Sequence, residues 1–288
     1  MHKWLLLLFL SMLFSCTQDE FHEESSILAV EGWIEHDKYP VVMVTKTLPV
    51  GSKTYNTHHL EDYLVKWAKV SVIHNRDTVV LTGKYDKGYF PPYIYTTSRI
   101  KGKSGETYKL LVEYEDLFAW AITTVQDPPE IDSFKVDRCV GSDSLYQIKA
   151  CMDLTHHRTD YYQFFVRVGA QKKQFLACFL GYLDGSTTDS LVEFPVYRGR
   201  EVGVHNGSTD YTPYFSLNDS VAVKCCTVDR MGYDYWKTFV ESEYLSGAAM
   251  LGTTINLPSN IIGGTGYWFG YGSTTSYFII KDFSLGGF

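Results

Sequence analysis

Apolar and polar residues alternate over short stretches along most of the chain, which is the pattern of half-buried β-strands. Residues 145–154 are the clearest case, because every second side chain from Tyr146 to Leu154 is apolar and those between are mostly polar. Similar stretches, rich in Val, Ile, Thr and aromatic residues, predict further strands at 27–34, 40–47, 68–73, 78–81, 105–114, 117–124, 131–138, 160–168, 173–182 and 220–228. The chain is therefore expected to be mainly β.

One stretch shows helical periodicity instead. Its apolar residues are spaced i, i+3, i+4 and i+8 and form one stripe: Trp236, Phe239, Val240 and Tyr244. This pattern predicts a helix near residues 232–247, which Gly247 is suited to end. Residues 48–64 are expected to form a long loop, and the glycine-rich tail at 260–280 is expected to combine strand and turn.

The stretch Asp127-Pro128-Pro129 divides the strands into two groups, because an X-Pro pair disfavours regular structure and stiffens the backbone. Roughly seven short strands before it predict an Ig-like or transthyretin-like β-sandwich over residues 27–128. Residues 129–288 are predicted to form a larger C-terminal β-sandwich domain that carries the helix.

The first 15 residues have the features of a signal peptide: a basic start at Lys3, an apolar run over 4–14, and small Ser15. The run is shorter than the roughly 20 residues that a membrane span needs. Leu13-Phe14-Ser15-Cys16 resembles a bacterial lipobox, which implies that Cys16 carries acyl chains such as palmitate and that a lipidated linker covers 16–26. The alternative is an ordinary secretory signal with an incidental cysteine.

The residues after Cys16 are polar and acidic. Gln18, Asp19 and Glu20 resemble the export signal that follows the lipidated cysteine in Bacteroidetes surface lipoproteins. The resemblance implies a protein anchored in outer-membrane lipid through Cys16 and facing the extracellular side. A plain solvated linker is the alternative.

Composition and motifs exclude several classes of function. The formal net charge of −7 disfavours binding to nucleic acid, whose phosphates require clustered Lys and Arg. Five cysteines remain beside Cys16, an odd number, so at least one thiol is expected to be free, and Cys225 is expected to be buried. No spacing typical of a metal, phosphate or catalytic site stands out, so neither a cofactor nor a metal is expected, and the protein is predicted not to be an enzyme.

Four short motifs place a hydroxyl between an aspartate and an aliphatic residue. They resemble Bacteroidetes O-glycosylation sites, and the candidate hydroxyls are Thr78, Ser144, Ser190 and Ser220. The alternative is turn chemistry, because Asp-Ser pairs often end a turn before a strand begins.

Two stretches dense in aromatic residues are candidate surfaces for a small ligand, glycan, peptide or partner protein. The first contains Tyr89, Phe90 and Tyr93, and the second contains Tyr267, Trp268 and Tyr271. Core packing is the alternative for both, because β-sandwiches use many aromatic residues.

Three motifs together resemble a known family. They are Ala29-Val30-Glu31-Gly32-Trp33-Ile34, Gly105-Glu106-Thr107-Tyr108 and the tail from Asn260 to Tyr271. They are similar to a Bacteroidetes outer-membrane lipoprotein family catalogued as domain of unknown function 4249, whose members accompany TonB-dependent receptors. The resemblance implies a non-enzymatic, surface-exposed accessory or ligand-capture subunit of a TonB-dependent nutrient importer. A structural or adhesive cell-surface lipoprotein is the alternative, and a hydrolase on a β scaffold is a third.

Overall fold

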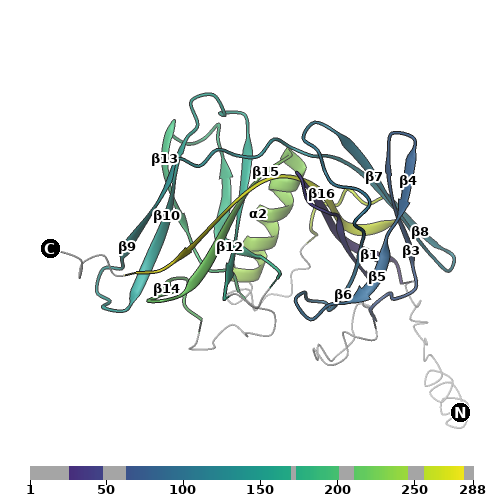
Figure 1. The fold of residues 1–288 in the computed structure, drawn as a ribbon, viewed down its shortest axis with the longest axis horizontal. Helices are drawn as coiled ribbons and strands as arrows, with labels where there is room; N and C mark the ends of the chain where they lie inside the picture. The colour runs from purple at the N-terminus through teal and green to yellow at the C-terminus, as the bar shows by residue number, and fades with distance from the viewer. Residues whose placement is uncertain (1–25, 48–62, 170–172, 201–210, 246–255, 282–288) are drawn as a thin grey trace, which may run out of the picture.

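The computed structural model describes residues 26–47, 63–169, 173–200, 211–245 and 256–281, and these residues form three β-sheets and one helix (Figure 1). The mainly β class with β-sandwich architecture and one helix is therefore confirmed. An eight-stranded sheet in the order β12-β11-β15-β16-β1-β2-β6-β5 runs through the whole molecule. A four-stranded sheet packs against each half of it.

The N-terminal half is a sandwich between the sheet β4-β3-β7-β8 and one end of the long sheet. Its strands are β1 Leu28–Glu35, β2 Val41–Lys46, β3 Lys69–His74, β4 Asp77–Val80, β5 Thr82–Tyr85, β6 Tyr93–Thr96, β7 Thr107–Tyr114 and β8 Leu117–Thr124. Alternate residues of these strands point inward and form one apolar core, in which Val30, Leu110 and Trp268 are fully or almost fully buried. Trp268 comes from the other end of the chain.

The C-terminal half is a second sandwich, in which β10 pairs with β9, β13 and β14 and faces β11 and β15. The strands are β9 Ser133–Arg138, β10 Leu145–Asp153, β11 Tyr161–Val168, β12 Leu176–Asp184, β13 Leu191–Val196, β14 Phe215–Ser216, β15 Ser220–Val228 and β16 Gly264–Ile279. The apolar residues that alternate along β10, such as Ile148 and Met152, lie in this second core as the sequence pattern predicted.

Strand β16, yellow in Figure 1, joins the two halves. Its first eight residues pair in parallel with β1, from Leu28↔Gly264 to Glu35↔Tyr271. Its last eight pair antiparallel with β15, from Thr227↔Gly272 to Ser220↔Ile279. The division of the chain near residue 128 stays a prediction, and this pairing shows that a cut there would separate β1 from its neighbour β16.

Glycines in β16 allow the backbone of the connecting segment to approach it closely. A Cβ atom at Gly272 would collide with the carbonyl oxygen of Asp127, and one at Gly270 with that of Thr124. The tail combines a turn at Gly263 with one 16-residue strand, so strand and turn are both present as expected.

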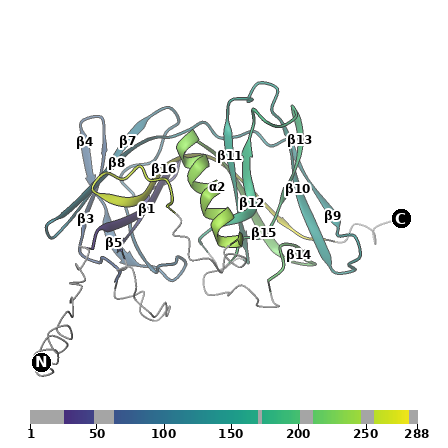
Figure 2. The ribbon, with the colours of Figure 1, turned by 180° about the vertical axis from the view of Figure 1, so that it is seen from behind.

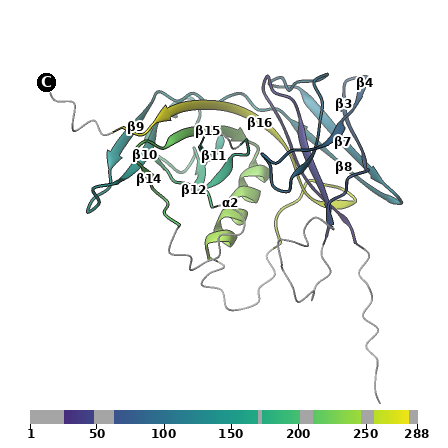
Figure 3. The same cartoon turned by 60° about the horizontal axis from the view of Figure 1, so that its bottom comes forward.

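Helix α2 Arg230–Leu245 lies on the concave face of the long sheet, between the two sandwiches (Figures 2 and 3). Asp229 caps it, because its Oδ1 accepts the N–H of Gly232 at 2.6 Å. Two residues of the predicted apolar stripe, Trp236 and Phe239, lie in a core shared with β11, β12, β15 and β16, and Trp236 is stacked on Phe269 at 5.3 Å between ring centroids. The helix begins two residues before the predicted 232–247 range because Asp229 caps it.

Candidate ligand cavity

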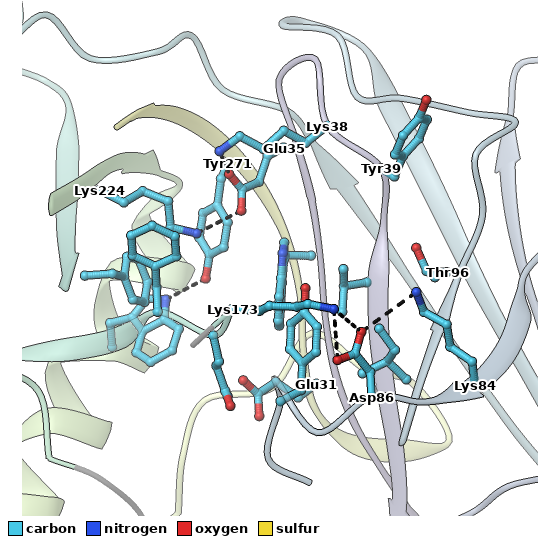
Figure 4. A pocket seen from close by; sticks show the side chains of 18 of the residues that line it. Glu31, Glu35, Lys38, Tyr39, Lys84, Asp86, Thr96, Lys173, Lys224 and Tyr271 are labelled. Carbon is cyan, nitrogen blue, oxygen red and sulfur yellow. Dashed lines mark hydrogen bonds and ion pairs between the residues drawn. The ribbon is translucent and has the colours of Figure 1, made fainter. Parts of the chain in front are cut away.

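A cavity of ≈ 430 Å³ opens on the concave face beside α2 (Figure 4). Its walls come from β1, β2 and the turn between them, from β5, β6 and their connection, from the segment before β12, and from one or two residues each of β11, β15, β16 and α2. Both sandwiches therefore contribute to one hollow, and residues far apart in the sequence meet across it.

Alternation along β1 sets the floor of this cavity. Val30, Gly32 and Ile34 point into the N-terminal sandwich, so Glu31, Trp33 and Glu35 point to the opposite face, where the cavity lies. A strand that buries one face in the N-terminal core thus presents two carboxylates and an indole to a concave surface on the other.

Glu35 is the centre of a buried charge network. Its Oε1 accepts a hydrogen bond from Lys224 Nζ at 2.8 Å, and its Oε2 accepts bonds from Lys38 Nζ at 2.6 Å and from Ser273 Oγ at 2.7 Å. The side chains of Glu35 and Lys224 are only 4% and 7% exposed. Burial alone would raise the pKa of Glu35, but the two lysines lower it to about 2, so the pair is ionised.

Aromatic rings surround the ammonium group of Lys224. Nζ lies 4.9 Å from the ring centroid of Phe175, 5.1 Å from that of Phe165 and 5.6 Å from that of Tyr271. Ring faces attract cations, so these contacts partly replace the water that Lys224 loses on burial.

A second carboxylate lies at the opposite side of the cavity. Lys173 Nζ donates to Asp86 Oδ2 at 2.9 Å, and Lys84 Nζ lies 3.9 Å from the same oxygen. These ammonium groups lower the pKa of Asp86. Lys173 is 59% exposed, so this pair is in contact with solvent.

Two further hydrogen bonds, both donated by backbone N–H groups, reinforce the contact between Asp86 and Lys173. The N–H of Gln174 donates to the carbonyl oxygen of Gly88 at 3.0 Å, and the N–H of Phe90 donates to Gln174 Oε1 at 2.7 Å. We call these five residues, Asp86, Gly88, Phe90, Lys173 and Gln174, the clasp. It links the N-terminal sandwich to the segment before β12 across one side of the cavity.

Glu31 differs from both paired carboxylates. Among the described residues its carboxyl group has no hydrogen bond or ion pair, and burial raises its pKa to about 7. At neutral pH the group is therefore close to half protonated and can either donate or accept a hydrogen bond.

The first aromatic stretch is divided between the cavity and its surroundings. Tyr89 lines the cavity, with its ring centroid 6.4 Å from that of Trp33. Phe90 is 37% exposed and belongs to the clasp. Tyr93 does not line the cavity, because its hydroxyl donates to the carbonyl oxygen of Lys66 and its ring packs on the N-terminal core.

The second aromatic stretch is not an exposed surface. Trp268 is fully buried in the N-terminal core, and Tyr267 is buried beneath α2, where its hydroxyl donates to Asp229 Oδ1 at 3.0 Å. Tyr271 is also buried, yet it lines the cavity and its hydroxyl accepts the indole N–H of Trp236. Core packing accounts for Tyr267 and Trp268 because alternate residues of β16 fill two different cores.

The remaining predicted residues lie away from the cavity. Thr78, Ser144 and Ser220 are exposed and Ser190 is partly exposed, each at or near the start of a strand. Cys16, Gln18, Asp19 and Glu20 lie outside the described residues. The five cysteines from Cys139 to Cys226 are free thiols, and Cys225 is fully buried as predicted.

Sequence reasoning missed the charged residues of the cavity. Lys224 gave the clearest signal, because it interrupts an otherwise apolar strand, 220–228, both faces of which are buried. Glu31 and Glu35 gave a weaker one, as acidic residues on alternate positions of an apolar strand. Asp86 and Lys173 gave no signal, since both lie in segments that connect strands.

Within the described residues, no helix combines the length and the apolar character of a membrane span. Nor does any group of three His, Cys, Asp or Glu side chains within them come together as a metal site would require.

Comparison with known proteins gives one result at the level of the family. No curated protein matches the chain. The family described as Domain of unknown function (DUF4249) matches residues 17–277. This match covers most of the sequence and agrees with the resemblance of the three motifs, so the chain belongs to the DUF4249 family.

Proposed function

We propose that the protein is a lipid-anchored, surface-exposed outer-membrane lipoprotein that captures a small ligand for a TonB-dependent nutrient importer. In this proposal Cys16 holds the protein to outer-membrane lipid, the polar residues Gln18–Glu20 direct it to the cell surface, and the folded part is a non-enzymatic accessory subunit of the importer.

The observation that carries the proposal is the cavity beside α2. Its ≈ 430 Å³ falls within the roughly 300–1,000 Å³ of small-molecule sites. Its lining combines aromatic rings with a few charged groups, which is also typical of such sites. Both sandwiches form its walls, a position that favours binding because ligand pockets occur preferentially where domains meet.

The charges in the cavity favour binding over catalysis. Glu35 is ionised and held by three donors, and the carboxylate of Asp86 is paired with Lys173. A general acid or base works best with a pKa near the operating pH, and these two carboxyl groups are both shifted downward. Glu31 has a suitable pKa, but within the described residues its carboxyl group has no hydrogen-bonded or ion-paired partner that would complete a catalytic pair.

Co-purification tests the accessory role. The protein, tagged at its C-terminus, is extracted from native outer membranes in mild detergent, and mass spectrometry identifies what accompanies it. We expect a TonB-dependent receptor in stoichiometric amount. A monomer without any receptor would contradict the accessory role.

A second function, a structural or adhesive surface protein, is favoured by the outer face of the sheet β4-β3-β7-β8. Val80, Phe118 and Ile122 are each about half exposed there. Exposed apolar side chains on one sheet face are typical of contacts with another protein. Self-association in place of a receptor in the same experiment would favour this function.

We also propose that the exposed hydroxyls of Thr78, Ser144 and Ser220, with that of Ser190, carry glycans. A sugar is bulky and requires such surface positions. The exported protein should then show an intact mass above that of its sequence. The excess should disappear when all four residues are replaced by alanine, and an unmodified wild-type mass would contradict the proposal.

A further inference from the structure

Lysines outnumber carboxylates around the cavity, although the whole chain has a net charge of −7. The described residues that line it include Lys38, Lys84, Lys173 and Lys224 against Glu31, Glu35 and Asp86. The lining therefore has one excess positive charge when Glu31 is ionised and two when it is protonated. A positively charged cavity in an acidic protein requires a physical reason.

The pairing of these groups shows where the excess lies. Glu35 is shared between Lys224 and Lys38, and Asp86 is shared between Lys173 and Lys84, so each carboxylate has two ammonium partners. One positive charge is thus left over at each side of the cavity (Figure 4). Lys38, Lys84 and Lys173 are 47%, 52% and 59% exposed, so this excess charge is hydrated and can attract an entering anion.

Aromatic rings line the cavity together with these charged groups. Trp33 and Tyr89 lie at 6.4 Å between ring centroids on the N-terminal side, and Phe175 and Tyr271 surround Lys224 on the other. Planar apolar groups stack favourably on such rings. The lining therefore offers flat apolar contact beside ammonium groups.

From this arrangement we infer that the cavity binds a small organic anion whose body is aromatic or otherwise planar and apolar. The lysines hold its acidic group, and the rings of Trp33 and Tyr89 contact its body. This inference rests on the proposed capture of a small ligand and names the chemical class of that ligand.

The four lining lysines disfavour a cationic ligand, because like charges repel. Glu31 is the one lining carboxyl group in the described part of the chain that has no lysine partner. Burial raises its pKa to about 7, so it is only partly ionised at neutral pH. In its protonated form it can donate a hydrogen bond to an anion instead.

Three probes that share one ring system and differ in charge test the inference. They are 2-naphthoate, neutral 2-naphthamide and the cationic 2-naphthylmethylammonium ion, titrated by isothermal calorimetry into the full-length protein in non-ionic detergent at neutral pH. A detergent blank removes the heat of partition. We expect 2-naphthoate to bind about tenfold more tightly than the amide, and the ammonium probe to bind most weakly.

A double variant and a control variant test whether 2-naphthoate binds in this cavity. The double variant Lys84→Gln/Lys173→Gln removes two solvent-exposed lysines, so folding should persist, and we expect 2-naphthoate to bind about fivefold or more weakly while the amide is unaffected. Lys69→Gln is the matched control, because Lys69 is also exposed and ion-paired, with Glu113 at 2.8 Å, but does not line the cavity. It should leave all three affinities unchanged.

The outcomes separate this inference from the function on which it rests. If the amide binds as tightly as 2-naphthoate, or the ammonium probe binds most tightly, the anionic class is wrong while a ligand cavity remains. If no probe binds, the planar anionic class is also wrong, and co-purification of a receptor still decides the accessory role. Equal weakening by Lys69→Gln would overturn the assignment to this cavity.

Discussion

Two carboxylates on opposite sides of the cavity are each held between two lysines, yet their surroundings differ sharply. The partner of Glu35 is Lys224, which is 7% exposed and enclosed by three rings. The partner of Asp86 is Lys173, which is 59% exposed. Similar distances, 2.8 and 2.9 Å, thus describe interactions of very different energy.

Solvation explains the difference. Removing one partner from a buried pair leaves an unpaired charge in a medium of low dielectric constant, whereas an exposed group is simply rehydrated. We therefore infer that the Glu35 network fixes how β1, β15 and β16 lie together. The Asp86 pair costs less to break, because Lys173 is mostly in water and Asp86, although only 11% exposed, keeps Lys84 nearby, so the clasp is the side of the cavity better suited to opening for a ligand.

The largest expected effect comes from breaking the buried pair. Lys224→Met leaves the Glu35 carboxylate with Lys38 as its one cationic partner and with the hydroxyl of Ser273 among the described residues, and we expect the free energy of unfolding to fall by about 3–5 kcal/mol. Urea denaturation followed by circular dichroism measures it. The double variant Glu35→Gln/Lys224→Met is the control, because it removes both charges and should recover most of the loss. A double variant as unstable as the single one would contradict the electrostatic explanation.

Acid should weaken the same network. The pKa of Glu35 is about 2 in the fold against an ordinary value of 4.5, so its contribution is fully present above pH 4.5 and is lost as the pH falls towards 2. The expected loss is on the order of 3 kcal/mol. Urea denaturation at several pH values in this window should show a shallower pH dependence in Glu35→Gln/Lys224→Met than in the wild type. The same pH dependence of stability in both proteins would contradict the lowered pKa of Glu35.

Glu31 should give a pH dependence of the opposite sign. Its pKa is raised to about 7, so the stability associated with its protonated form is present below pH 4.5 and is lost as the pH rises through 7. We expect the wild type to lose about 2 kcal/mol between pH 5 and 8.5 through this group. Glu31→Gln should remove that loss in thermal unfolding over the same range, and an unchanged slope in the variant would rule the effect out.

Much of the fold could be predicted from the sequence because its signals are local. The alternation of β10 and the apolar stripe of α2 depend only on neighbouring residues, and both appear in the structure. Strand β16 was less predictable. Its glycines suggested turns, but Gly270 and Gly272 are needed because the backbone of Thr124 and Asp127 approaches them closely. That approach is set by tertiary structure, which local patterns do not encode.

The cavity could be predicted far less well, for the same reason. The sequence carries a signal for Lys224, as a charge in an apolar strand, but its partner Glu35 is 189 residues away. Their meeting depends on the pairing of β15 and β1 with opposite halves of β16. Of the aromatic residues proposed for a surface, Tyr89 and Tyr271 line the cavity and Trp268 lies in the core. An aromatic residue carries no local sign of which environment it occupies.

The smallest expected effect on stability comes from the exposed pair. Lys173→Gln should shift the urea midpoint only slightly, because Lys173 is 59% exposed and Asp86 keeps Lys84 as a partner at 3.9 Å. The clasp itself should loosen, since Lys173 adjoins Gln174, whose amide donates to Gly88. Hydrogen exchange measured by mass spectrometry should therefore be about twofold or more faster in peptides covering residues 84–92. Lys69→Gln should leave those peptides unchanged. If Lys173→Gln instead lowered the midpoint as far as Lys224→Met does, the two pairs would be equivalent, and the clasp could not be the side of the cavity that opens.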